Sequence, residues 1–250
     1  MERSLKNTVA VITGGAEGIG YEITAKFLEQ QAKTVIVLDN NEEKGAAAVV
    51  DLNSKYGDGK AVFIKCDVTK DLDDVSKKIF ETYSQVDVLV NNAGTVDEKS
   101  ARKTIELNSI ALMEWSMKFW EHMRKDKGGL GGTILNIGSI YSFAIDPYVV
   151  FYKASKFAVQ GFTTSLGHAD NYKKFGVRLI IICPGFTYSA LTDRQLCWDE
   201  HKEDFAKFVK NEIWQNAEEV GKAAVAVFQK GHSGSSWKIV VLMQLQVSTY

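Results

Sequence analysis

Tyr152 and Lys156 lie four positions apart in the stretch FYKASKF, and Ser139 precedes Tyr152 by thirteen positions. Residues four apart lie on the same side of a helix. A phenol has a pKa of about 10, too high for an efficient base at neutral pH, but a neighbouring ammonium favours the phenolate and lowers that pKa. A serine hydroxyl can stabilise charge on a substrate oxygen, as an oxyanion-hole donor does. Together these side chains predict removal of an alcohol proton while a hydride leaves the carbon.

Each of these residues also has an ordinary interpretation. A Tyr–Lys pair at this spacing is usually a surface pair on a helix, and a serine at the end of a strand usually belongs to a turn. The elements that position the three side chains must therefore decide between the two interpretations.

Short apolar runs rich in β-branched residues alternate with amphipathic segments along the chain. The runs that predict strands cover residues 8–13, 34–39, 61–66, 86–94, 133–139, 177–185 and 237–243. The segments with helical spacing cover residues 17–31, 41–56, 71–85, 103–126 and 152–175. Strands that are apolar on both faces and separated by helices indicate a parallel sheet covered on both sides. The sequence therefore predicts an α/β fold with a doubly wound, mostly parallel seven-stranded sheet of the Rossmann type.

No composition shift or linker divides the chain, so we expect a single domain over residues 1–250. Residues 186–230 differ from the rest of the chain in composition: they are rich in aromatic and charged residues, and no strand is predicted there. We expect this segment to form part of a substrate pocket or a lid over it.

The stretch TGGAEGIG, residues 13–20, follows the first predicted strand and opens the first predicted helix. Its glycines allow a tight turn and a close approach of the backbone to a pyrophosphate, and the helix start offers amide groups and a positive dipole end. A turn with a purely structural role is the alternative, but the strand before and the helix after it favour a dinucleotide site. The predicted contacts are Gly14, Glu17, Gly18, Ile19 and Gly20.

Asp39 ends the second predicted strand, nineteen positions after Gly20. An acid at this place can accept hydrogen bonds from the adenosine ribose hydroxyls, and it repels a 2′-phosphate. Glu17 and Asn40 provide no cation for such a phosphate. The sequence therefore predicts NAD rather than NADP as the cofactor. A helix-capping role of Asp39 is compatible with this one.

Two further strand ends contribute to the same predicted edge. Asp67 and Val68 end the third strand, where a carboxylate can either bind an adenine amino group or cap the next helix, and both interpretations stay open. Asn91, Ala93 and Gly94 of the stretch NNAG end the fourth strand, and they are predicted to contact the cofactor.

With these motifs in their order, the chain resembles the short-chain dehydrogenase/reductase family over essentially its whole length. The residues that carry the resemblance are TGGAEGIG, Asp39, Asp67, Val68, NNAG, Asn108, Ser139, the YKASK of residues 152–156, Pro184 and Gly185. The stretches KGGLGGTILNIGS and GSSWKIVVL look like the subgroup of 15-hydroxyprostaglandin dehydrogenases and insect-type alcohol dehydrogenases.

The resemblance implies a role for each motif residue. Tyr152 is the general base, Ser139 holds the substrate oxygen, and Lys156 also binds the nicotinamide ribose. Asn108, which is unfavourable within a helix, holds a water that links Lys156 to solvent. The cofactor-binding set further includes Tyr152, Pro184, Gly185, Phe186 and Thr187. Whether Thr187 or Ser189 contacts the nicotinamide carboxamide stays open.

Composition excludes several other classes of partner. A formal net charge of −1 provides no attraction to nucleic acid or to an anionic membrane, and no apolar run approaches the length of a membrane span. The three cysteines are scattered and the four histidines show no metal-ligand spacing, so we expect no disulfide framework and no metal site. No targeting signal is visible, and we expect a cytoplasmic protein.

The predicted pocket suits a small lipophilic alcohol or ketone, because its lining is apolar and aromatic. The substrate contacts are assigned to Ser139, Tyr141, Val149, Tyr152, Phe186 and Tyr188. Three functions fit: an NAD-dependent dehydrogenase of a lipophilic secondary alcohol, a ketone reductase that works mainly in reverse, and a non-catalytic NAD-binding developmental protein. The first leads; the intact set of four catalytic residues argues against the third, and cofactor preference and cellular redox state distinguish the second.

An excess of apolar residues on the helix beginning near Thr104, including Trp115, Phe119 and Trp120, has two explanations. It is either a broad core contact or a two-fold interface with a second copy through this helix and the helix of Tyr152. The family resemblance favours a homodimer. The residues beyond Leu242 differ from those of many tetrameric relatives, which makes a tetramer less expected.

Overall fold

The computed structural model describes residues 2–193, 197–240 and 246–248. Its main sheet has eight strands in the order β10-β9-β6-β5-β4-β1-β2-β3, of which all but β10 run parallel. The strands are β1 (Val9–Thr13), β2 (Thr34–Asp39), β3 (Ala61–Lys65), β4 (Val88–Asn91), β5 (Gly132–Ile137), β6 (Val177–Pro184), β9 (Ser236–Ile239) and β10 (Gln246–Ser248). The predicted doubly wound sheet with seven parallel strands is confirmed, and β10 adds a short antiparallel edge.

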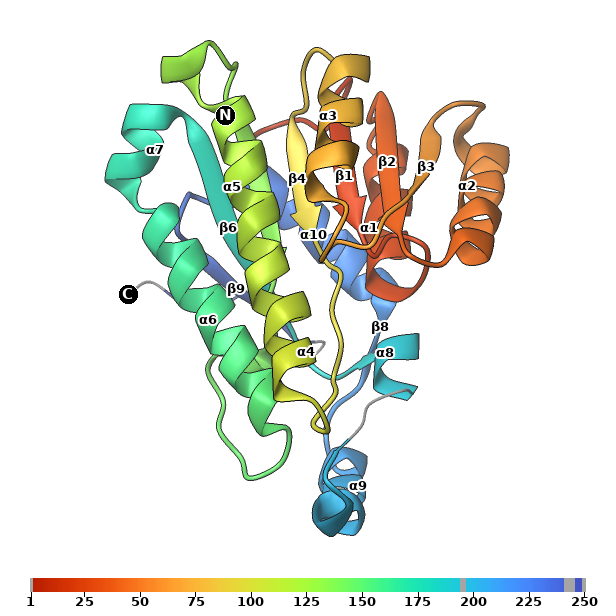
Figure 1. Cartoon of the computed structure of the whole chain (residues 1–250), viewed down its shortest axis with the longest axis vertical. Helices are drawn as coiled ribbons and strands as arrows, with labels where there is room; N and C mark the ends of the chain where they lie inside the picture. Colours follow the sequence, from red (N-terminus) through yellow and green to blue (C-terminus); the bar gives the residue numbers. More distant parts are fainter. Residues whose placement is uncertain (1, 194–196, 241–245, 249–250) are drawn as a thin grey trace.

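Helices cover both faces of this sheet (Figure 1). One face carries α3 (Leu72–Thr82), α4 (Ala101–Ile105), a π-helical stretch over Glu106–Ala111, α5 (Leu112–Met123) and α6 (Val150–Leu166). The other face carries α1 (Gly18–Glu29), α2 (Glu42–Tyr56) and α10 (Ala217–Lys230). The core strands β1 and β6 are buried along their whole length, as strands with helices on both sides must be.

The predicted amphipathic segment 152–175 forms two helices rather than one. It contains most of α6 and the short helix α7 (Ala169–Phe175), and Gly167 and His168 separate them. The predicted strand 237–243 begins at Ser236 and is described as far as Ile239; residues 241–243 lie outside the described part of the chain.

The segment 186–230 contains more regular structure than we expected. Two-residue strands, β7 (Thr187–Tyr188) and β8 (Gln215–Asn216), pair with each other, and between them lie α8 (Ala190–Asp193) and α9 (Lys202–Lys210). The segment was predicted to lack a strand, and that prediction is wrong. The last part of the segment, α10, packs on the sheet beside α1 through Val227 and Phe228 and so belongs to the core.

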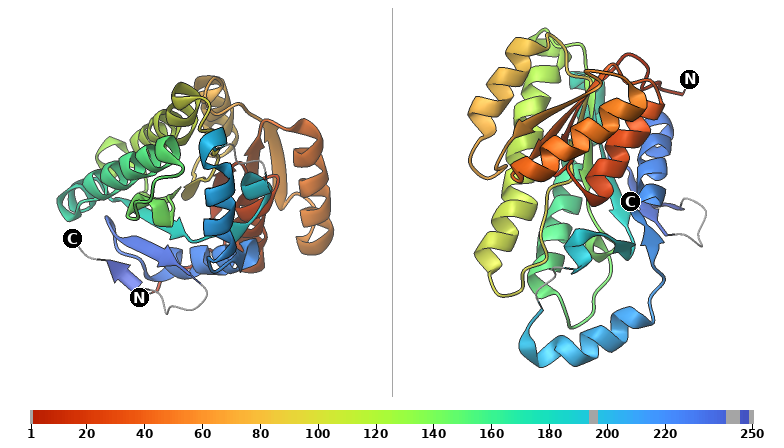
Figure 2. Two further views of the ribbon diagram at one scale, coloured as in Figure 1. Left: turned by 90° about the horizontal axis from the view of Figure 1, so that it is seen from below. Right: turned by 90° about the vertical axis from the view of Figure 1, so that its right-hand side faces the viewer.

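Helix α9 lies beyond the sheet, at the lower end of the molecule (Figures 1 and 2). Its Phe205 is buried against residues that follow β5, so α9 closes one side of the region beyond the carboxyl ends of the strands. Among the residues described, no helix has the length and apolar character needed to cross a membrane.

Candidate active site

The three residues that raised the question of proton transfer meet beside the carboxyl end of β5. Ser139 follows that strand, and Tyr152 and Lys156 lie one turn apart on α6, all three less than a tenth exposed. The Lys156 Nζ donates to the carbonyl of Ile137 at 2.8 Å and lies 5.5 Å from the centre of the Tyr152 ring. The Ser139 Oγ accepts from the Tyr141 amide at 3.1 Å, which fixes its position. These side chains are therefore no surface pair.

Burial sets the pKa values of this group. It raises the pKa of Tyr152 to about 12, and a hydrogen bond with the Ser139 hydroxyl acts in the opposite direction. Burial also lowers the pKa of Lys156 to about 8. The pKa of Tyr152 is thus raised rather than lowered as we expected beside Lys156, because loss of solvent disfavours the charged form of both groups.

Asn108 lies in the π-helical stretch between α4 and α5, a type of distortion that is frequent at functional sites. Its Oδ1 accepts from the Thr95 amide, and its Nδ2 donates to the Thr95 carbonyl, both at 2.8 Å. The Nδ2 also donates to Ser155 Oγ at 3.1 Å. Both amide hydrogens are thus used to join the loop after β4 to the helix of Tyr152. The predicted water relay stays a prediction.

The glycine turn has the geometry that a phosphate cradle needs. Gly14 and Gly18 have positive φ angles of 62° and 57°, which favour glycine. A Cβ on Gly20 would lie 2.2 Å from the Gly14 carbonyl oxygen, so only glycine fits there. The Glu17 side chain makes no capping hydrogen bond at the start of α1 and binds Lys44 instead. The residue before α1 therefore provides no side-chain cap for the first amides of this helix.

Asp39 is half-buried at the end of β2, as predicted from its place in the sequence. Its Oδ2 accepts from the Ala16 amide at 3.2 Å and its Oδ1 from the Asn41 amide at 3.0 Å, so it joins the glycine turn to the start of α2. Asn40 is exposed beside it. Sequence analysis missed Lys44, a cation at this corner whose charge is compensated by Glu17.

Asp67 acts within the turn that follows β3. Its Oδ1 accepts from the amide and the hydroxyl of Thr69, and Lys70 lies 2.8 Å from its Oδ2. The Lys70 ammonium and the Thr69 hydroxyl hold the pKa of this carboxyl below its ordinary value. The residue before α3 is Asp71, so Asp67 does not cap that helix. The carbonyl of Val68 accepts from the Trp115 indole at 2.9 Å.

Within the NNAG stretch, the side chain that supports the cofactor edge is Asn92. Its Nδ2 donates to the carbonyls of Thr13 and Gly14 at 3.1 and 2.9 Å and so holds the glycine turn. The side chain of Asn91, which we assigned to the cofactor, is instead buried and donates to Ser116 and Asn136, both at 2.9 Å. A cofactor contact of Asn91 would therefore come from its backbone and stays a prediction, because at the end of a buried strand alternate side chains point to opposite faces.

The two residues after Asn92 lie near the glycine turn and the cavity, and their contact with the cofactor stays a prediction. The Ala93 amide donates to the Thr13 hydroxyl at 3.1 Å. Gly94 lies on the wall of the cavity described next, and a Cβ on it would lie 3.2 Å from the Asn108 Oδ1.

A cavity joins the glycine turn to the Tyr152 group. Its lining comes from the start of α1 and from the segments that follow β4, β5 and β6, and it consists of Ile19, Asn92, Gly94, Val96, Ile137, Gly138, Ser139, Ile140, Tyr141, Val149, Tyr152, Lys156, Pro184, Gly185, Phe186, Thr187, Ser189, Leu191, Thr192 and Phe205. Five of the predicted substrate contacts, Ser139, Tyr141, Val149, Tyr152 and Phe186, line this cavity, whereas Asp39, Asn40, Asp67 and Val68 do not. Tyr188 is an exception: it is 60% exposed and stacks on Trp214, with 5.0 Å between ring centres.

The structure separates the two candidates for the carboxamide contact. The Thr187 hydroxyl donates to the Gly185 carbonyl at 2.9 Å and accepts from Gln215 Nε2 at 3.2 Å. Ser189 lines the cavity. A Cβ placed on Gly18 would lie 3.4 Å from the Cβ of Ser189. Ser189 therefore faces the glycine turn, whereas the Thr187 hydroxyl is engaged within the protein.

A doubly wound sheet with a glycine turn after β1 and a Ser–Tyr–Lys group after β5 defines a class of nucleotide-dependent oxidoreductase folds. The sequence pattern of the family described as short chain dehydrogenase matches residues 8–200. The chain belongs to this family.

Curated relatives agree with this assignment, and a solved structure shares the fold. The chain is 37% identical over 187 residues to 15-hydroxyprostaglandin dehydrogenase [NAD(+)] of Rattus norvegicus, covering 74% of this chain and 70% of the relative. The Homo sapiens protein of the same name is 36% identical over the same shares. A Pseudomonas aeruginosa RhlG/NADP active-site complex has a similar fold, with a TM-score of 0.79, 23% identity and coverage of 95% and 96%.

The depressed pKa of Lys156 predicts a pH-dependent contribution to stability. The folded-state pKa of about 8 lies below the ordinary value of 10.5. The unfolded chain therefore binds more protons between these values, so this contribution is fully present above pH 10.5 and is lost as the pH falls through about 8. The free energy of unfolding of the wild type, relative to Lys156→Met, should increase from pH 8 to 10.5. Denaturant titrations measure it, and a constant difference would contradict the buried site.

Proposed function

We propose that this chain is an NAD-dependent dehydrogenase that oxidises a lipophilic secondary alcohol. The observation that carries the proposal is the burial of Ser139, Tyr152 and Lys156 together on the wall of one cavity that also reaches the glycine turn. The curated relatives are named as NAD(+)-dependent dehydrogenases of a hydroxylated prostaglandin, which is itself a lipophilic alcohol.

The residues present fit a dinucleotide. The absence of a Cβ at Gly20 and the uncapped start of α1 provide room and amides for a pyrophosphate. Asp39 would hold the adenosine ribose, and Asp67 and Val68 would lie by the adenine. Gly94, Lys156 and the stretch from Pro184 to Thr187 would hold the nicotinamide end. When bound, the oxidised cofactor supplies the hydride acceptor and a positive ring charge.

The side chains of this chain would then handle the proton. Tyr152 accepts the hydroxyl proton of the substrate, and the Ser139 hydroxyl stabilises the developing charge on the same oxygen. An ammonium has three N–H donors, and Lys156 uses one of them on Ile137, which leaves two for the ribose and for proton relay. A pKa of about 12 keeps Tyr152 protonated at rest, so formation of the phenolate depends on nearby positive charge.

The cavity favours a lipophilic substrate. Around the Ser139 and Tyr152 hydroxyls the lining residues are apolar or aromatic: Val96, Ile140, Tyr141, Val149, Phe186, Leu191 and Phe205. An apolar pocket with a few polar groups at one end orients a lipophilic alcohol with its hydroxyl toward those groups. We assign Phe186, Leu191 and Phe205, which line the pocket, to a lid that closes over it.

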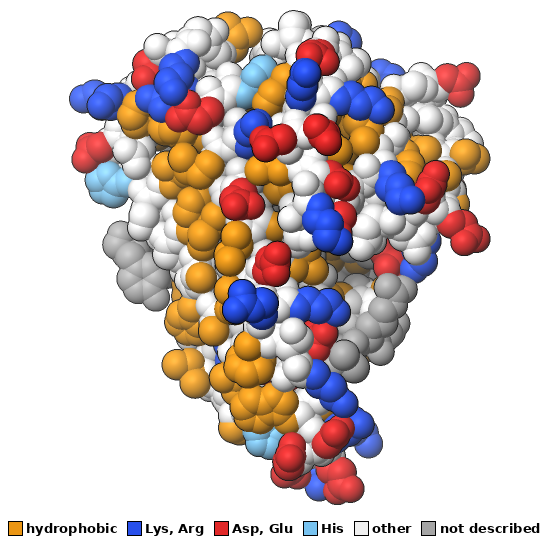
Figure 3. Space-filling view, viewed as in Figure 1, with side chains coloured by type: hydrophobic (Ala, Val, Ile, Leu, Met, Phe, Trp, Pro, Cys, Tyr) orange, Lys and Arg blue, Asp and Glu red, His pale blue; other side chains and the backbone are white. Residues whose placement is uncertain are grey.

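A homodimer is the second part of the proposal. Trp115, Phe119 and Trp120, which suggested an interface, are buried in the core, so the core contact explains them. Other apolar residues of the same helices are exposed: Ile110, Met117, Val150 and Phe157. Figure 3 shows hydrophobic side chains in a band along α5 and α6. This band supports pairing through these helices. A tetramer was less expected because of the residues beyond Leu242, of which 243–245 and 249–250 lie outside the described part of the chain.

The proposed chemistry is tested with a panel of lipophilic secondary alcohols and NAD. The wild type should form NADH with at least one member. Tyr152→Phe should lower kcat about 100-fold or more, with NAD affinity nearly unchanged, because only the proton-transfer group is removed. Tyr83→Phe, the same chemical change far from the cavity, is the control. If Tyr152→Phe kept most of the activity, the proposed base would be wrong.

Cofactor choice is tested by calorimetric titration with NAD and NADP. Asp39 should make the wild type bind NAD at least about tenfold more tightly, or ~1.4 kcal/mol. Asp39→Ala combined with Asn40→Arg should narrow or reverse this preference, because a repelling charge is replaced by an attracting one. Asp58→Ala, an exposed acid after α2, should change nothing. Equal affinities of the wild type for NAD and NADP would contradict the assignment of NAD as the preferred cofactor.

Assembly is tested by light scattering at micromolar concentration. The wild type should have twice the 27.8 kDa mass of one chain. Phe157→Glu should shift the mass toward that of one chain, because it places a charge in the apolar band. Val50→Glu alters an exposed apolar residue on α2 and should leave the dimer intact. A wild type of single-chain mass with full activity would contradict the dimer.

A further inference from the structure

Glu98 is a buried carboxylate that none of the family motifs explains. It lies in the loop between β4 and α4 and is 2% exposed. Its Oε2 accepts from the Phe151 amide and its Oε1 from the Tyr152 amide, both at 2.8 Å. Burying a carboxylate is costly unless hydrogen bonds compensate for the lost water. Both oxygens are compensated by the same short piece of chain, the start of α6.

The start of α6 depends on this contact. The helix begins at Val150, and the preceding residue, Val149, provides no side-chain cap. The first amides of a helix have no partner within the helix, and a negative charge there also interacts favourably with the helix dipole. Caps usually come from the adjacent residue. Here the cap comes from a residue more than fifty positions away, so it joins two separate parts of the active site.

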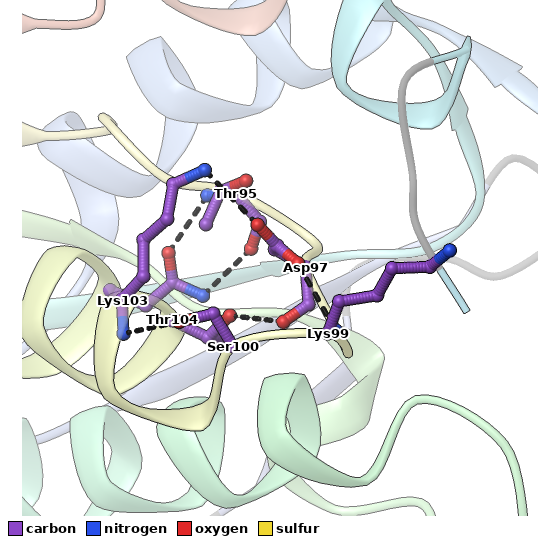
Figure 4. A network of polar contacts seen from close by, with 7 residues as sticks. Thr95, Asp97, Lys99, Ser100, Lys103 and Thr104 are labelled. Carbon is purple, nitrogen blue, oxygen red and sulfur yellow. Dashed lines mark hydrogen bonds and ion pairs between the residues drawn. The ribbon is translucent and has the colours of Figure 1, made fainter. Parts of the chain in front are cut away.

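The loop that carries Glu98 is itself held firmly (Figure 4). The Asp97 carboxylate pairs with Lys103 at 3.0 Å, and the Asp97 carbonyl accepts from the Thr104 hydroxyl at 2.6 Å. A few residues earlier, Thr95 is bound through both backbone groups by Asn108. These contacts hold the backbone of the loop in place, and the Glu98 side chain extends from it toward α6.

The same residue also contacts the segment that covers the pocket. The indole of Trp198 donates to the Glu98 carbonyl at 2.8 Å, and its ring lies edge-on to Phe151, with 5.9 Å between ring centres. Glu98 thus touches the start of the Tyr152 helix through its side chain and the segment before α9 through its backbone.

We infer that Glu98 is a positioning residue for Tyr152: its carboxylate fixes the first turn of α6, and Trp198 ties the pocket-covering segment to the same point. The inference rests on the proposed function, in which Tyr152 transfers the proton. A small displacement of the reacting hydroxyl lowers the rate of the chemical step. It affects the affinity for the substrate much less.

The experiment uses the full chain with Glu98→Gln and Glu98→Ala, and with Glu81→Gln and Glu81→Ala as controls on the exposed side of α3. Amide hydrogen exchange by NMR should become about tenfold faster or more at Phe151 and Tyr152 in Glu98→Ala, while core amides of β6 keep their rates. Glu98→Gln, which retains one acceptor oxygen, should lie between it and the wild type. In the alcohol assay, kcat should fall about tenfold or more, with KM within about threefold.

Trp198→Phe provides a variant that leaves the carboxylate in place. It removes the bond to the Glu98 carbonyl and keeps an aromatic ring against Phe151, so it should accelerate exchange at the same two amides to a smaller extent. Unchanged exchange at Phe151 and Tyr152 in both Glu98 variants, or equal acceleration throughout the molecule, would overturn the inference. Exchange requires no substrate, so a wild type that oxidises no alcohol would refute the proposed function without deciding the role of Glu98.

Discussion

A buried ammonium and a buried phenol, one turn apart on α6, are the constraint that the rest of the site must satisfy. Removing both groups from water disfavours their charged forms, as the pKa values of about 8 for Lys156 and about 12 for Tyr152 reflect. The protein compensates with fixed polar partners, namely the Ile137 carbonyl for Lys156 and the Ser139 hydroxyl for Tyr152. Such preorganised partners allow charge to move during a reaction without rearrangement of solvent.

Those partners keep their places because polar groups tie the elements together inside the core. Asn136 on β5 accepts from Asn91 on β4 and donates to Thr163 on α6, each at 2.9 Å. Ser155, three residues after Tyr152 on α6, accepts a hydrogen bond from Asn108. A fully satisfied buried network specifies one arrangement of its members. The helix that carries Tyr152 is thus held from the sheet, from the π-helical stretch and, at its first turn, from Glu98.

Features with a local signal were predictable from the sequence. The strands followed from β-branched runs, and the positions of Gly20, Asp39 and Ser139 followed from their places at strand ends. Features that depend on the orientation of a side chain, or on a partner far away in the sequence, could not be predicted. Asn91 and Asn92 are identical in type and adjacent, yet only Asn92 supports the glycine turn. The contact of Glu98 with α6 has no local signal, because helix-capping rules examine neighbouring residues.

The central proposal is that a bound nicotinamide cofactor would accept the hydride from an alcohol carbon while Tyr152 takes the hydroxyl proton. The most direct measurement uses a lipophilic secondary alcohol carrying deuterium on its carbinol carbon, with mass spectrometry of the reduced cofactor after incubation with the wild type. The account predicts that one deuterium passes from the alcohol to the nicotinamide and that Tyr152→Phe nearly abolishes this transfer. Reduced cofactor without the label, or label transfer that persists in Tyr152→Phe, would contradict it.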